Sequence, residues 1–124
     1  MILIDTSSWI HFLRPDGSAA ARARVVAALE SGVACWCPMV RLELWSGAKG
    51  EREKKVLREF ERLIPELPIT PEVWRDAYEL ARRCRKGGVT VPSTDLLIHA
   101  CASHHGAMLE HEDGDFDLIV RALR

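Results

Sequence analysis

Four acidic side chains interrupt otherwise apolar segments of this 124-residue sequence: Asp5, Glu43, Asp95 and Asp113. An unpaired carboxylate is costly to bury, so each of them needs a hydrogen-bond donor, water or a cation as a partner. Clusters of oxygen ligands favour hard divalent cations such as Mg²⁺ and Mn²⁺. In a carboxylate site these ions lower the pKa of a bound water and stabilise charge on a reacting phosphoryl group, which is the chemistry of phosphodiester hydrolysis.

The first acid must be positioned by the apolar run that precedes it, Ile2–Ile4. Three consecutive apolar residues without polar alternation indicate a strand that is buried on both faces, as in the middle of a parallel sheet. Thr6, Ser7 and Ser8 are residues that favour a helix start. Asp5 is therefore predicted where a central strand meets a helix N-terminus, which is where ligand sites form in open α/β sheets.

Two further apolar runs, 33–37 and 107–109, are predicted as strands, and a brief third one is expected at 67–69. Helical patterns separate the runs, which predicts an α/β fold with a mostly parallel sheet and helices on both faces. In such units a helix N-terminus lies at the carboxyl edge of the strands. Asp5 and Asp113 follow predicted strands, and Glu43 and Asp95 lie early in predicted helices. All four acids are therefore predicted to meet at one edge.

Bringing four carboxylates together has an energetic consequence. Two unit charges ~4 Å apart repel by roughly 4 kcal/mol at an effective dielectric of 20, so the cluster must bind cations or take up protons. Taken singly, each acid also fits a helix cap, a solvent-facing position or a turn, and only the shared edge favours a metal site. His99 shares a helix face with Asp95 and His111 adjoins the acidic loop, but the favoured interpretation of both is a packed or surface histidine.

The composition is ordinary for a globular protein, with 48% apolar and 28% charged residues, and it predicts one domain spanning residues 1–124. No apolar run approaches the roughly 20 residues of a membrane span, and no basic region precedes the apolar start. We therefore expect no membrane partner and a cytoplasmic location. The cysteines lack zinc-like spacing and are predicted to be buried thiols: Cys35, Cys37, Cys84 and Cys101.

Charge is segregated along the chain. Residues 75–86 include five basic and two acidic side chains, whereas residues 110–117 include five acidic side chains and only His111 as a candidate cation. An acidic metal site beside a basic rim has this pattern, and so do two unrelated solvated faces. The basic residues of 82–86, or those of 49–58, are the candidates for contact with nucleic-acid phosphates.

Four segments in order resemble the motifs of PIN-domain ribonucleases: Ile-Leu-Ile-Asp-Thr-Ser at 2–7, Leu-Glu-Leu-Trp-Ser-Gly at 42–47, Asp-Leu-Leu-Ile-His-Ala at 95–100 and Asp-Gly-Asp-Phe at 113–116. The length of the chain is similar to that of VapC toxins of toxin–antitoxin pairs. The resemblance implies a three-layer α/β/α, PIN-like nuclease domain with four to five short strands. It also implies a type II toxin that cleaves RNA endonucleolytically with Mg²⁺ or Mn²⁺.

Carried over by position, the resemblance implies that Asp5, Glu43, Asp95 and Asp113 are the catalytic acids. Among them Asp5, Asp95 and Asp113 would bind the metal directly, with Glu43 and Asp115 as further candidate ligands. Thr6 or Ser7 would support the metal or the scissile phosphate. The resemblance also implies an RNA substrate, a homodimer and inhibition by a VapB-like antitoxin whose C-terminal segment crosses the active-site groove.

One departure from the family pattern is the run Leu109-Glu110-His111-Glu112, which adds two acids where many relatives have neither. A non-catalytic PIN-like module that binds RNA or protein remains an alternative function. A phosphate switch of the response-regulator type is disfavoured, because no lysine follows the last strand. A two-fold interface is expected to use Val56, Leu57 and Phe60 together with Trp45.

Overall fold

The computed structural model describes residues 1–124, and its centre is a short parallel sheet. Its strands are β1 (Ile2–Ile4), β2 (Ala34–Cys35) and β3 (Met108–Glu110), in the order β2-β1-β3. Leu3 pairs with Cys35 on one side and with Leu109 on the other. Leu3 and Ile4 are fully buried, as predicted for a central strand, so Asp5 leaves the sheet from its most enclosed position.

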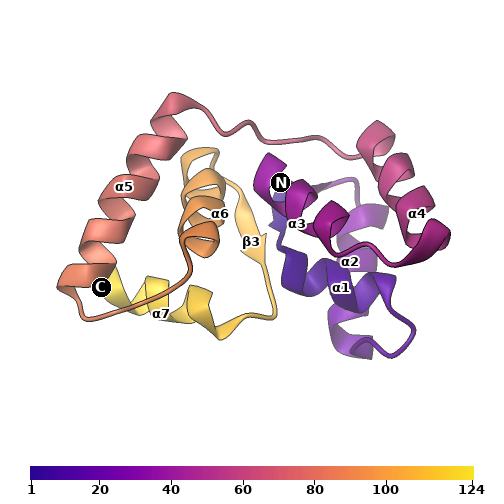
Figure 1. Cartoon of the computed structure of the whole chain (residues 1–124), viewed down its shortest axis with the longest axis horizontal. Coiled ribbons are helices and arrows are strands. Elements are labelled where there is room, and N and C mark those ends of the chain that lie inside the picture. The colour runs from indigo at the N-terminus through magenta and orange to yellow at the C-terminus, as the bar shows by residue number, and fades with distance from the viewer.

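Seven helices surround the sheet in the predicted α/β arrangement, and Figure 1 shows α1 to α4 gathered on one side and α5 to α7 on the other. Their bounds are α1 Thr6–Leu13, α2 Ala19–Glu30, α3 Pro38–Ser46, α4 Gly50–Leu63, α5 Pro71–Lys86, α6 Ser93–His104 and α7 Gly114–Ala122. None of these helices has both the length and the apolar character that a membrane crossing requires.

The sheet has three strands rather than the expected four to five. Residues 67–69 do not form a strand, and that part of the chain contributes only an isolated bridge between Trp36 and Glu66. Leu67 donates its N–H to the Trp36 carbonyl (2.8 Å), but the next rung would need an N–H from Pro38, which has none and begins α3. The sheet therefore ends at β2 on this side.

Helix boundaries follow the local chemistry closely at α5 and less closely at α6. Thr70 accepts a hydrogen bond from the N–H of Val73, and Pro71 occupies the first turn, where its missing N–H needs no partner. The N-cap of α6 is Pro92, which forms no side-chain cap although Ser93 and Thr94 follow it directly. The first N–H groups of α6 are therefore left without a capping side chain.

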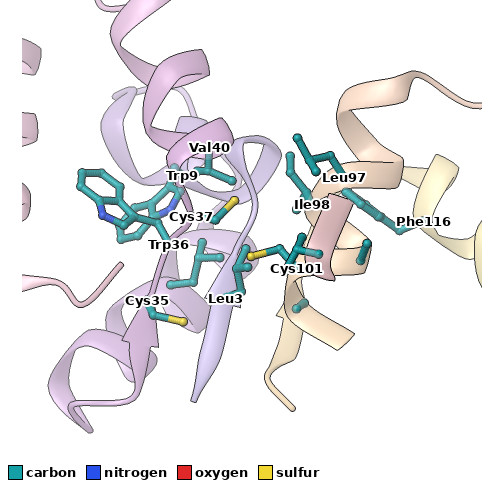
Figure 2. Packing of buried hydrophobic residues seen from close by; sticks show 14 of the residues in the cluster. Leu3, Trp9, Cys35, Trp36, Cys37, Val40, Leu97, Ile98, Cys101 and Phe116 are labelled. Carbon is teal, nitrogen blue, oxygen red and sulfur yellow. The ribbon is translucent and has the colours of Figure 1, made fainter. Parts of the chain in front are cut away.

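The core lies on both faces of β1. Figure 2 shows Leu3 between an aromatic group with Trp9 and Trp36 and a second group on α6 that includes Ile98 and Cys101. The ring centroids of Trp9 and Trp36 are 6.2 Å apart in an edge-to-face arrangement. All four cysteines are buried free thiols, as predicted.

Part of the expected two-fold interface belongs to this core instead. Leu57 is fully buried, and the ring of Phe60 lies 5.0 Å from that of Trp9. These side chains hold α4 against α1 within one chain, because the apolar face of α4 is needed to cover the aromatic group. The prediction that Leu57 forms an interface was therefore wrong, while the half-buried Phe60, Val56 and Trp45 stay predicted members of that interface.

Candidate active site

Asp5 is held at the carboxyl end of β1 by hydrogen bonds from the first turn of α1. It is only 3% exposed and forms the N-cap of α1. Its Oδ2 accepts hydrogen bonds from the N–H of Ser7 (3.0 Å) and from the Ser7 hydroxyl (2.6 Å). Burial raises the pKa of Asp5, while the Ser7 hydrogen bonds act in the opposite direction. Asp5 is thus both a helix cap and a member of the acidic site.

Three acids lie close enough together to hold one cation. Asp95, Asp113 and Asp115 each offer a carboxylate oxygen, and these oxygens lie within 4.8 Å of one another. Asp95 comes from the first turn of α6, while Asp113 is the N-cap of α7 and accepts a hydrogen bond from the N–H of Asp115 (2.9 Å). The cap places two carboxylates of one loop against the buried one, and we call this group the acidic triad.

Asp95 is the most perturbed member of the triad. It is 7% exposed, and its Oδ2 is buried without any hydrogen-bond partner. Burial, followed by repulsion from Asp113 and Asp5, raises the pKa of Asp95 to about 7. A buried carboxylate oxygen that faces two other carboxylates and lacks a donor is matched by a hard cation, so the residues present fit a divalent metal.

Glu43 lies near this group but outside the acidic triad. The hydroxyl of Thr6 donates to Glu43 Oε1 at 2.7 Å, which ties α3 to the first turn of α1. Burial raises the pKa of Glu43, and the charges of Asp5 and Asp113 add to that effect. The electrostatic coupling shows that the predicted acids do converge on one edge of the sheet.

The two hydroxyls predicted to support the metal or the phosphate donate to the carboxylates. Thr6 donates to Glu43 and Ser7 donates to Asp5, so each hydroxyl fixes the orientation of one acid. Ser7 Oγ also accepts a hydrogen bond from the N–H of Glu112 (3.0 Å). The first turn of α1 therefore links β1, α3 and the loop after β3 into one rigid frame.

The two additional acids before the last motif, Glu110 and Glu112, pair with Arg24. Glu110 accepts hydrogen bonds from Ser8 (2.7 Å) and from Arg24 Nε (2.8 Å), and Arg24 also forms an ion pair with Glu112. Sequence reasoning missed Arg24, because it lies on α2, 86 residues from Glu110, and carries no local signal of this role. The departure from the family pattern is thus part of an ion-pair network between α2 and β3.

The two candidate histidines have different surroundings. His111 Nδ1 accepts a hydrogen bond from the N–H of Asp113 (3.2 Å), and its ring packs 4.9 Å from that of Phe116. His99 lines a cavity between α5 and α6 together with Asp76 and Arg83, and burial lowers its pKa. His111 therefore shapes the loop that carries Asp113, and His99 is not among the residues of the triad.

The fold, with its cluster of acids at the carboxyl edge of the sheet, indicates a class of protein. Comparison with known families identifies the same class. The PIN-domain family model matches residues 2–121. Crystal structures with the same fold include DNA-bound VapBC from Salmonella typhimurium (TM-score 0.77, 18% identity, covering 94% of this chain and 89% of that one). VapC20 from Mycobacterium tuberculosis is a further example (TM-score 0.74, 19% identity, covering 94% and 93%). The chain belongs to the PIN-domain family.

Comparison with curated relatives places the chain in a narrower group within this family. The chain is 37% identical over 124 residues to VapC ribonuclease Mb1587 of Mycobacterium bovis, an alignment that covers 98% of this chain and 92% of the relative. Ribonuclease VapC11 of Mycobacterium tuberculosis matches with the same identity and coverage. Within the PIN-domain family, its relatives are thus VapC ribonucleases.

Proposed function

We propose that this chain is the toxin of a type II toxin–antitoxin pair and acts as a metal-dependent endoribonuclease. The single observation that carries the proposal is the buried, unpartnered oxygen of Asp95 beside Asp113 and Asp115. Relatives 37% identical over almost the whole chain are named ribonucleases, which supports RNA as the substrate. In this proposal residues 1–124 act as one nuclease domain in the cytoplasm.

The acidic triad would hold the cation, with Asp5 as the neighbouring carboxylate and Mg²⁺ or Mn²⁺ as the ion. When bound, such an ion lowers the pKa of a coordinated water and stabilises negative charge on the phosphate that is cleaved. The oxygen-only donor set supports a hard cation over zinc or copper, which prefer nitrogen and sulfur ligands.

The remaining residues would position groups and handle protons. Ser7 keeps Asp5 in a single orientation, because two donors are bonded to the same carboxylate oxygen. Thr6 occupies Glu43 Oε1 and leaves Oε2 free to accept a proton from an attacking water. The raised pKa of Glu43 makes it a better proton acceptor than an ordinary surface carboxylate.

The proposed partners follow from the structures with the same fold. The VapBC complex of Salmonella typhimurium contains a VapB together with a VapC and DNA, which supports a VapB-like antitoxin for this chain. A homodimer is part of the same proposal. Co-expression of the chain with a VapB-like protein, sought as the product of a short neighbouring reading frame, should abolish RNA cleavage and growth inhibition.

The direct test is the substitution Asp5→Asn, with Asp16→Asn in the exposed turn after α1 as the matched control. Asp5→Asn should abolish cleavage of an oligoribonucleotide and growth inhibition on expression, while the circular dichroism spectrum stays unchanged. The control should cleave like the wild type. Full metal-dependent cleavage by Asp5→Asn would refute the assignment, and RNA binding without turnover in Mg²⁺ and Mn²⁺ would favour the non-catalytic module.

A further inference from the structure

A second cavity lies between the end of α5 and the start of α6. One of its lining residues, Leu96, follows Asp95 of the acidic triad in the sequence. It has a volume of about 300 Å³, with an apolar floor of Ala81, Val89, Val91 and Leu96. Figure 1 shows the α5–α6 connection and the β3–α7 connection both on the lower side of the view. We call this cavity the α5–α6 pocket. Its size is at the lower end of the roughly 300–1,000 Å³ of small-ligand sites.

The rim of the α5–α6 pocket carries two arginines, one of which has no acidic partner in the protein. Arg82 and Arg85 line the pocket. Arg85 forms no ion pair within 4.0 Å, and Arg82 reaches only the exposed Glu79, at 3.4 Å.

On α4, the other candidate basic segment, Lys54 and Arg58 pair with one acid of their own helix, while Arg52 forms no ion pair. The cavity beside Arg52 is also lined by Glu53 and Glu59, whereas no acidic residue lines the α5–α6 pocket. The α5–α6 pocket is therefore the better site for an anion.

Unpaired backbone donors complete the pocket. The N–H groups of Thr90 and Val91, in the extended segment of the wall, donate to no group in the protein. The N–H groups of Ser93 and Thr94 are also free, because Pro92 forms no side-chain cap, but these two residues follow the wall and do not line the pocket. A ligand with a flat apolar face, polar edges and an attached anion would satisfy the floor, the N–H groups and the arginines together.

A single-stranded nucleotide has these three features. Building on the proposed ribonuclease function, we propose that the α5–α6 pocket binds the base of an RNA nucleotide adjacent to the acidic site, while Arg82 and Arg85 contact its phosphates. Bases in single-stranded RNA are unstacked and present both a face and an edge to a protein. The pocket would then set which nucleotide stands next to the acids, and so would contribute to target choice.

The test combines RNA from which one base has been removed with a protein variant in which the pocket is filled. Ala81→Leu would fill the α5–α6 pocket without weakening α5, because leucine is a good helix former. Affinity is measured by fluorescence anisotropy in an Asp95→Asn background with a labelled oligoribonucleotide and with abasic versions of it, one position at a time. Ala20→Leu, at an exposed site on α2, is the matched control.

Ala81→Leu should weaken binding of the intact RNA roughly tenfold, the loss expected for one stacked base. One abasic position should weaken binding to Ala20→Leu by a similar factor and have no further effect on Ala81→Leu, because both changes remove the same contact. An abasic penalty of equal size in both proteins at every position would overturn the proposal.

A second pair of variants tests the rim independently of the pocket's packing. Arg82→Ala/Arg85→Ala should reduce the steepness of log affinity against log salt by about 1.4, since each phosphate contact on a single strand contributes about 0.7. Arg58→Ala/Arg62→Ala on α4 should leave the slope unchanged, and an equal reduction by both pairs would overturn the proposal. Pocket-dependent RNA binding without cleavage by the native chain in Mg²⁺ or Mn²⁺ would support this inference while refuting the proposed function.

Discussion

Replacing Asp95 by asparagine should stabilise the metal-free protein at alkaline pH. Asparagine has nearly the shape of a protonated aspartate but cannot ionise. In the native chain the pKa of Asp95 is raised from its ordinary value of 3.8 to about 7, because the carboxylate is buried beside Asp113 and Asp5. The substitution removes a charge that the folded protein holds only at a cost when no cation is bound.

The sign and size of the effect follow from proton linkage. Between pH 4 and 7 the unfolded chain releases the Asp95 proton while the folded chain keeps it, so the free energy of unfolding falls as the pH rises. A difference of about three pH units, at about 1.36 kcal/mol each, sets an upper limit of about 4 kcal/mol above pH 7. Relaxation and water entry reduce this figure, so we expect Asp95→Asn to be about 2–4 kcal/mol more stable than the wild type at pH 8 and nearly equal at pH 4.

Urea unfolding in EDTA from pH 4 to 8, with Asp16→Asn as the control, measures this difference directly. Adding Mn²⁺ at pH 8 should stabilise the wild type and leave Asp95→Asn unchanged, because binding to the folded state alone raises stability. A stability difference between Asp95→Asn and the wild type that does not change with pH would refute the reasoning about burial and charge.

Three further predictions test separate parts of the frame. Glu43→Gln should lower the rate of RNA cleavage at least 100-fold with little change in the melting temperature, since it removes a proton acceptor and keeps the Thr6 hydrogen bond available; unchanged cleavage kinetics would exclude that role. Arg24→Ala should lower the free energy of unfolding by about 1 kcal/mol, because it leaves Glu110 and Glu112 without their cation at a partly exposed site, and 1 M salt should shrink this loss in urea titrations. Leu57→Ala should cost about 2–5 kcal/mol through loss of core packing, while its oligomeric state in sedimentation experiments should match that of the wild type.

The fold could be predicted from the sequence where the local chemistry of a segment and its burial favour the same structure. The apolar run before Asp5, the Thr70–Pro71 start of α5 and the glycine that ends that helix each specify one local structure. Residues 67–69 were harder to predict, because a run of suitable residues does not reveal that the neighbouring segment turns into α3 at Pro38, which has no N–H for a further rung. The predicted number of strands was therefore wrong at the edge of the sheet, while the central strand was predicted correctly.

The convergence of the acids was predictable from topology, but their partners were not. Parallel connections alone place Asp5, Glu43 and Asp95 on the carboxyl edge of the sheet. The capping of α7 by Asp113 decides which carboxylate oxygens lie within 4.8 Å of one another. This cap brings Asp115 into the triad. The Arg24–Glu110 pair depends on the packing of α2 against the sheet, which leaves no periodic trace in the sequence.

The most direct test of the account is the dependence of RNA cleavage on Mn²⁺ concentration for the wild type and for Asp113→Asn. We predict no cleavage by the wild type in EDTA, saturable recovery with Mn²⁺ or Mg²⁺, and at least a 100-fold loss for Asp113→Asn at saturating metal. Cleavage by the wild type in EDTA, or identical metal curves for the two proteins, would contradict the claim that this acidic edge holds the metal required for RNA cleavage.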